Sequence, residues 1–181
     1  VADCTYNNNL ADVSDLSGAI LALCSGEYEV KGKNTTIDDL VVRLLLNQSS
    51  NGSFGNDIIT TSESIIALSF FEGNIYEVKG DYKTEVYYYD VNNAILRGVN
   101  YLQGAKDQEC GYGNIKSTAY AIMALDSAGV DCDNDPGFTL NGKSTLDWLL
   151  MKQNEDGSFG ENKEDTALAV CAIVSHIRAM Q

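Results

Sequence analysis

A short glycine-rich motif occurs three times in this chain, and its recurrence restricts the fold more than any other feature. The three copies read NGSFG, ECGYG and DGSFG, with Phe54, Tyr112 and Phe159 as their aromatic residues, 58 and 47 residues apart. A weaker fourth copy, DCTYNN, contains Tyr6. Such self-similarity is typical of repeat proteins, in which each unit buries its apolar face against a neighbour. We therefore expect a repeat architecture.

Each copy of the motif lies between two segments that have helical periodicity. The segment before it has apolar residues at helical spacing and ends near a glutamine, and the segment after it is apolar nearly throughout. The first segments are IDDLVVRLLLNQ, VNNAILRGVNYLQ and STLDWLLMKQ; the second are residues 61–71, 117–128 and 165–177, with 15–24 as a fourth. The repeat is thus predicted to be a helical hairpin closed by a glycine-rich loop.

A short extended connector joins one hairpin to the next. EYEVKGKN, IYEVKGDY and FTLNGKST alternate aromatic, polar and aliphatic residues and include the turn glycines Gly32, Gly80 and Gly142. The tyrosine-rich insert at 81–91 predicts a β-hairpin with the YEVKG segment. TTIDD and STLD follow two of the connectors and predict helix starts, because a hydroxyl three residues before an acid forms a capping box.

The two helices of each unit differ in polarity, which predicts two layers. The first carries charges such as Asp38, Asp39 and Arg43 and suits an outer layer, whereas the second, as in STAYAIMALDSAG, suits an inner layer packed on both sides. We expect an all-α fold of about seven helices with short extended connectors or a small β-hairpin. The units of this one domain run roughly over 1–34 (partial), 35–80, 81–142 and 143–181.

The recurring loop residues are expected to fasten neighbouring hairpins. Glycines permit a tight reversal, the aromatic ring packs between units, and the glutamine bonds exposed amides at a helix end. This structural motif comprises Gln48, Gly52, Phe54, Gly55, Gln103, Gly111, Tyr112, Gly113, Gln153, Gly157, Phe159 and Gly160.

The loop at Gln153 to Gly160 resembles the repeat of squalene and terpene cyclases and of protein prenyltransferase β subunits. GNIKSTAYAIMAL at 113–125 and the passage at 128–160 are similar to the helical domain of cobalamin carriers and to prenyltransferase-like domains of bacterial surface proteins. The resemblance covers nearly the whole chain and implies a partial α/α toroid. It also implies an extracellular or cell-surface location, membership of a longer protein, and another domain or copy that completes the toroid.

The residues that the resembling enzymes use for catalysis are not found at their required spacing. A terpene cyclase uses Asp-x-Asp-Asp, whereas Asp131, Asp133 and Asp135 form Asp-x-Asp-Asn-Asp in a connector. A protein prenyltransferase binds zinc through Asp, Cys and His, but the chain has one histidine, His176, and no matching Asp-x-Cys. Thioester domains need Cys-Gly-Glu-Gln, and ECGYGN lacks it. We assign no catalytic residue and no cofactor, and interpret His176 as an ordinary helix-surface or partly buried residue.

Two groups of residues remain as weak binding candidates. Asp131, Asp133 and Asp135 alternate like part of a calcium loop, but the glycine comes one place late and no glutamate closes the loop, so a structural turn is favoured over calcium. Tyrosines are common on partly solvated contact surfaces, and they also pack over helix ends. The candidates for a contact surface are Tyr87, Tyr88 and Tyr89, with Tyr120 on a second helix.

Charge and cysteine content narrow the function further. The formal net charge of -14 opposes binding to nucleic acid or anionic lipid, and no apolar run is long enough for membrane insertion. The five cysteines form no CxxC pair: Cys171 is predicted to be a buried hydrophobe, and Cys4, Cys110 and Cys132 can pair in an oxidising compartment. We expect a non-catalytic binding, interaction or scaffolding domain, with a small-molecule ligand at a concave face as an option. The alternative is an isoprenoid-processing enzyme.

Overall fold

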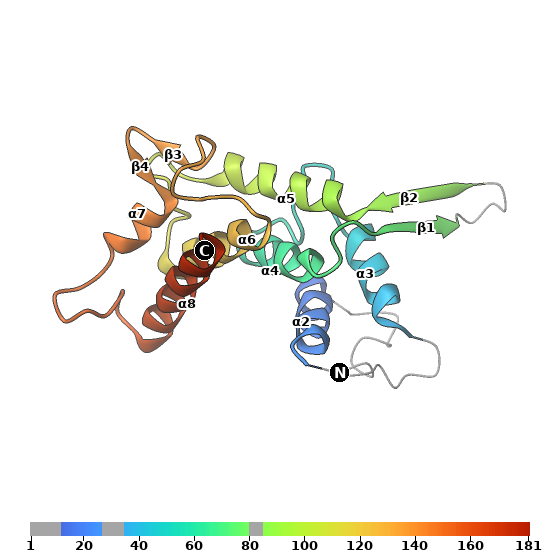
Figure 1. Cartoon of the computed structure of the whole chain (residues 1–181), viewed down its shortest axis with the longest axis horizontal. Helices are drawn as coiled ribbons and strands as arrows, with labels where there is room; N and C mark the ends of the chain where they lie inside the picture. The colour runs from blue at the N-terminus through green and yellow to red at the C-terminus, as the bar shows by residue number, and fades with distance from the viewer. Residues whose placement is uncertain (1–11, 27–34, 80–84) are drawn as a thin grey trace. The chain divides into compact units, whose positions relative to one another are not determined.

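The computed structural model of the chain (Figure 1) describes residues 12–26, 35–79 and 85–181. This part is 54% helical, with seven helices and two short antiparallel hairpins, which confirms a mostly helical fold with a small β-hairpin. The helices are α2 (Val13–Cys24), α3 (Ile37–Leu46), α4 (Ile58–Ser69), α5 (Val91–Ala105), α6 (Ile115–Ser127), α7 (Thr145–Leu150) and α8 (Lys163–Ala179). The strands are β1 (Ile75–Lys79), β2 (Val86–Asp90), β3 (Thr139–Leu140) and β4 (Lys143–Ser144).

The chain forms two compact units, 1–98 and 99–181, and the boundary falls within α5. In the first unit α2 packs against α3 and α4, and in the second α6 packs against α7 and α8. The pairs α2 with α4 and α6 with α8 are the apolar second helices of successive repeats. Within each unit these helices therefore pack against one another.

Helix starts are defined by side chains that accept hydrogen bonds from unpaired backbone amides. Thr36 with Asp39 and Ser144 with Asp147 form complete capping boxes at α3 and α7, which confirms both predicted starts. The helices that follow the glycine-aromatic loops begin at a different kind of cap, a single acid or amide side chain: Asp57, Asn114 and Asn162.

The three glycine-aromatic loops are closed by the same hydrogen bond. In each, the backbone amide of the aromatic residue donates to a threonine hydroxyl in the first turn of the following helix. The N···Oγ1 distances are 2.9 Å for Phe54 and Thr61, 3.0 Å for Tyr112 and Thr118, and 3.0 Å for Phe159 and Thr166. All three aromatic side chains are buried. The loop thus binds its own helix, and these threonines were not part of the predicted motif.

The backbone of the second loop, ECGYG, follows that of the other two, although its sequence differs. Two positions before the aromatic residue, Gly52 and Gly157 have φ of 91° and 86°, and Cys110 holds the same left-handed region at 69°. A side chain in that region costs on the order of 1–2 kcal/mol. Gly111 therefore serves another purpose: it makes room for a neighbour, because a Cβ at this position would overlap the indole ring of Trp148.

The glutamines do not accept from helix-end amides, so that expectation was wrong. Gln48 Nε2 donates to the carbonyl oxygens of Gly52 and Ala94, at 3.0 and 2.8 Å, and Gln153 Nε2 donates to that of Gly157 at 3.1 Å. The carbonyls of Gly52 and Gly157 lie in the loops, outside the helices, whereas Ala94 lies in the first turn of α5. Gln103 does not take this position: it lies nine residues before its aromatic residue rather than six, in the last turns of α5.

The connectors form two antiparallel hairpins. β1 pairs with β2 in the register Tyr76 to Tyr89, which confirms the predicted hairpin. β3 pairs with β4 around Asn141 and Gly142, whose φ values of 53° and 73° match the two-residue Asn-Gly turn typical of twisted hairpins. The predictions that involve Cys4, Tyr6, Gly32 and Gly80 concern residues outside the described ones.

Replacing Gly111 with alanine is expected to destabilise the protein by about 1–3 kcal/mol, because the new methyl group would displace the buried ring of Trp148. The matched control is Gly18→Ala in the middle of α2, where nothing lies within 4 Å of the added carbon. That change should stabilise by about 0.5–1 kcal/mol. Denaturant unfolding measures both, and effects of equal sign would contradict the close approach.

Replacing Thr118 with valine is expected to lower the free energy of unfolding by about 1–3 kcal/mol, because the amide of Tyr112 loses its acceptor in a buried place. Thr60→Val, at a half-buried position of α4, is the isosteric control, since no hydrogen bond of its hydroxyl is seen in the described part of the chain; the control should change stability by less than about 0.5 kcal/mol. Equal losses in the two variants would show that the hydrogen bond does not hold the loop.

Candidate functional site

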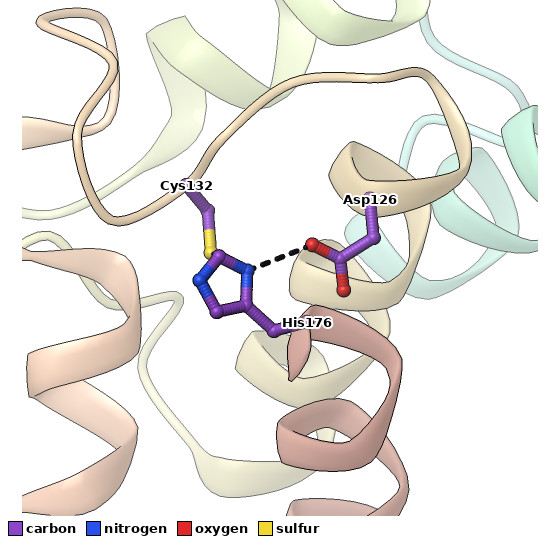
Figure 2. Close-up of side chains that lie close together, drawn as sticks. All are labelled: Asp126, Cys132 and His176. Atoms are coloured by element: carbon purple, nitrogen blue, oxygen red, sulfur yellow. Dashed lines mark hydrogen bonds and ion pairs between the residues drawn. The ribbon is translucent and has the colours of Figure 1, made fainter. Parts of the chain in front are cut away.

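Three side chains from distant parts of the second unit meet at one place (Figure 2). Asp126 is in the last turn of α6, Cys132 is in the connector that follows, and His176 is in the last turn of α8. His176 Nδ1 lies 3.0 Å from Asp126 Oδ1 and 3.7 Å from Cys132 Sγ. The three candidate ligand atoms all lie within 4.8 Å of one another. An imidazole, a thiol and a carboxylate together are a typical donor set for a transition metal.

The chain reverses its direction at the C-terminus of α6 and passes over the cluster. Gly129 has φ of 69°, and the amides of Gly129 and Val130 donate to the carbonyl oxygens of Asp126 and Leu125. This is the Schellman pattern, which reverses the chain at a helix C-terminus. Asp131 fixes the next turn: its carboxylate accepts from the backbone amides of Asp133 and Asn134 at 3.0 and 3.2 Å. Cys132 lies between the Schellman motif and the end of the turn that Asp131 holds, and it is fully buried.

The environment of the cluster is both buried and negative. The side chain of Asp126 is 2% exposed, and its Oδ2 accepts no hydrogen bond of ordinary geometry, although Ser175 lies near enough to favour the ionised form. Burial raises the pKa of Asp126, and the hydrogen bond from His176 opposes that rise. Burial, with the nearby carboxylates of Asp126, Asp131 and Asp133, also raises the pKa of the Cys132 thiol strongly. These carboxylates favour a cation over an anion.

This cluster was missed in the sequence. His176 was interpreted as an ordinary helix-surface or partly buried residue, whereas it is buried and hydrogen-bonded to Asp126. Asp126 was not selected at all, although a carboxylate in an alanine-rich inner helix signals a buried charge that needs a partner. Asp126 and Cys132 are six residues apart, so the arrangement is not the Asp-x-Cys pattern of protein prenyltransferases.

The three weak calcium candidates do not converge on a common centre; each holds a separate part of the connector. Asp131 anchors the turn described above, Asp133 Oδ1 accepts from the Ser144 hydroxyl at 2.6 Å, and Asp135 Oδ1 accepts from the Gly137 amide at 2.7 Å. These bonds support the interpretation of the segment as a structural turn.

The candidate tyrosines lie in both units. Tyr87 and Tyr88 on β2 are exposed, and Tyr89 is half-buried opposite Tyr76. The Tyr76 hydroxyl donates to Asp38 at 2.8 Å, which ties the hairpin to α3. Tyr120 on α6 is half-buried in the second unit. The hairpin is therefore fastened through Tyr76, and the tyrosines of β2 remain candidates for a contact surface.

The prediction for Cys171 was wrong. This residue is exposed on α8, because the helix packs with one face on α6 and leaves another face uncovered among the described residues. Cys24, Cys110 and Cys132 are also free thiols, and the last two are buried. Pairing of Cys110 or Cys132 with another described cysteine is thus not seen.

No protein-family model matches this sequence, and no curated protein matches it significantly. Among the described residues, no helix is both long enough and apolar enough to cross a membrane.

Calcium at millimolar concentration is expected to leave the melting temperature unchanged, because the carboxylates of Asp131, Asp133 and Asp135 are already engaged by amides and a hydroxyl. Magnesium at the same concentration controls for ionic strength. Thermal unfolding followed by circular dichroism measures the effect, and a rise of several degrees with calcium alone would reverse the interpretation.

Proposed function

We propose that this chain is a non-catalytic interaction domain of the α/α-toroid type, and that a face of α8 binds a second copy of the chain. The observation that carries the proposal is an uninterrupted apolar surface on that helix. A helix expected to be packed on both sides instead exposes one side, and covering such a surface is a usual reason for association.

The apolar face of α8 is defined by five exposed residues at helical spacing. Val170, Val174 and Ile177 are 48%, 38% and 53% exposed, and they are the larger side chains of the set. Ala167 and Cys171 complete the face, and no acidic side chain lies between its ends. In a chain with a formal net charge of -14, a surface of this length without a carboxylate is an exception. Its small and β-branched side chains permit close approach of another helix.

Charges at the two ends of this face favour a second copy in antiparallel orientation. Glu164 and Arg178 are both exposed and lie seven residues before and after Cys171, and Glu164 also forms an exposed ion pair with Lys116 at 2.9 Å. Residues seven apart lie on the same side of a helix. If two α8 helices cross about a two-fold axis near Cys171, Glu164 of each copy lies next to Arg178 of the other. The interface would then contain two equivalent ion pairs. Such a self-complementary arrangement is what a two-fold interface requires.

The wider function follows from the same proposal. An assembling domain suits a scaffolding or binding role in an extracellular or cell-surface protein, which is the setting that the sequence resemblance implies. The exposed tyrosines of β2 are a second contact surface in this proposal. Magnesium-dependent turnover of a prenyl diphosphate would instead favour the isoprenoid-processing alternative.

Substituting aspartate for Val174 is expected to weaken dimerisation about tenfold or more, because the interface would bury a carboxylate without a partner. Sedimentation velocity over a range of concentrations under reducing conditions measures it. Leu96→Asp is the matched control, since Leu96 is 58% exposed on a different helix, α5, and is not one of the residues of the α8 face. A wild-type protein that stays monomeric at high micromolar concentration would refute the proposal.

Charge exchange tests the orientation of the two helices. Arg178→Glu should weaken the dimer, and adding Glu164→Arg to it should restore the affinity, because the pairs reform with reversed polarity. Mild oxidation should link two wild-type copies through Cys171, and Cys171→Ser should abolish the link. A double variant no better than Arg178→Glu alone would contradict the antiparallel arrangement.

A further inference from the structure

We propose that Asp126, Cys132 and His176 form a binding site for a divalent transition metal ion, with zinc as the ion that fits the donor set best. The proposal is independent of dimerisation. Zinc is usually bound by thiolate, imidazole and carboxylate groups in tetrahedral geometry. Here Asp126 Oδ1, Cys132 Sγ and His176 Nδ1 would be three ligands, and the fourth position would be open to water or to a group from outside the chain.

Two of the three distances between the ligand atoms lie within or near the range expected around a tetrahedral ion. With bonds of about 2.0–2.3 Å to oxygen, nitrogen and sulfur, ligand atoms around zinc lie roughly 3.3–3.8 Å apart. Cys132 Sγ and His176 Nδ1 are 3.7 Å apart, within this range, and His176 Nδ1 and Asp126 Oδ1 are 3.0 Å apart, slightly below it. The third pair, Cys132 Sγ and the ligand oxygen of Asp126, lies within 4.8 Å. Receiving the ion would therefore require the aspartate and histidine to move slightly apart.

Two further features favour a cation at this position. Asp126 and His176 lie in the last turns of α6 and α8, so two helix C-termini with their partial negative charge are close to it. Asp126 Oδ2 is buried and accepts no well-aligned hydrogen bond, which is costly for a carboxylate that has no cation beside it. A bound ion would remove that cost and would also stabilise Cys132 as a thiolate.

The other nitrogen of the histidine faces a carboxylate, as in many metal sites. His176 Nε2 lies 3.9 Å from Asp131 Oδ1. Metal-bound histidines usually direct their second N–H toward a carboxylate or a carbonyl, which fixes the ring and strengthens the ligand. Asp131 is held by the amides of Asp133 and Asn134, so it is suited to this positioning role.

A buried structural Asp–His pair is the competing explanation, and the two differ in whether the thiol takes part. The experiment titrates the full reduced chain, freed of metal by a chelator, with cobalt(II) and then with zinc. Cobalt bound to a thiolate gives an intense near-ultraviolet charge-transfer band, and tetrahedral coordination gives strong visible bands. We expect one equivalent of cobalt to produce both, zinc to displace it, and zinc to raise the melting temperature.

Variants identify the ligands. Cys132→Ser should remove the charge-transfer band, whereas Cys171→Ser, which removes an exposed thiol on α8, should leave it unchanged. Asp131→Asn keeps an acceptor for the turn and should weaken metal binding about 10–100-fold without changing the far-ultraviolet circular dichroism. Absence of a thiolate band in the wild type, or its survival in Cys132→Ser, would overturn the proposal.

Discussion

The hydrogen bond from the amide of a loop aromatic residue to a threonine hydroxyl is the contact on which the repeat depends. A glycine-rich loop has many conformations when free, and ordering it costs conformational entropy. One buried bond at the base of the loop, together with an aromatic ring packed in the core, fixes both ends of the reversal. The following helix then starts in a defined direction, and within each unit it packs against the second helix of the neighbouring repeat, as α4 does on α2 and α8 does on α6.

The second loop, which contains Cys110 and Tyr112, shows that this bond matters more than the glycine pattern itself. Cys110 occupies a left-handed position that glycine holds in the other two loops, yet Tyr112 still donates to Thr118. The strain of that cysteine is local, whereas the loss of the threonine would leave an amide without a partner in the core. A definition of the motif by hydroxyl and aromatic residue therefore describes the structure better than one by glycine alone.

Part of the fold could be predicted from the sequence because its signals are local. Capping boxes and the β1–β2 hairpin depend on residues a few positions apart, and each was found where its signal lay. The cluster could not be found in this way. Asp126 and His176 are 50 residues apart, and nothing in either segment specifies which turn of α6 meets which turn of α8. The exposure of Cys171 depends likewise on what covers α8, which is not encoded in the helix itself.

The proposed metal site and the proposed dimer interface use opposite sides of α8. α8 contributes His176 to the buried cluster, while Val174 and Ile177 lie on its exposed face. A metal ion would hold the end of α8 to the end of α6, and a partner would cover the opposite side. The metal ion and the second copy each stabilise the folded state to an extent set by their own concentration and affinity. Neither requires the other to bind. However, a helix end that is fixed by coordination presents its outer face with less conformational freedom, so an ion at the cluster would lower the entropic cost of docking on α8.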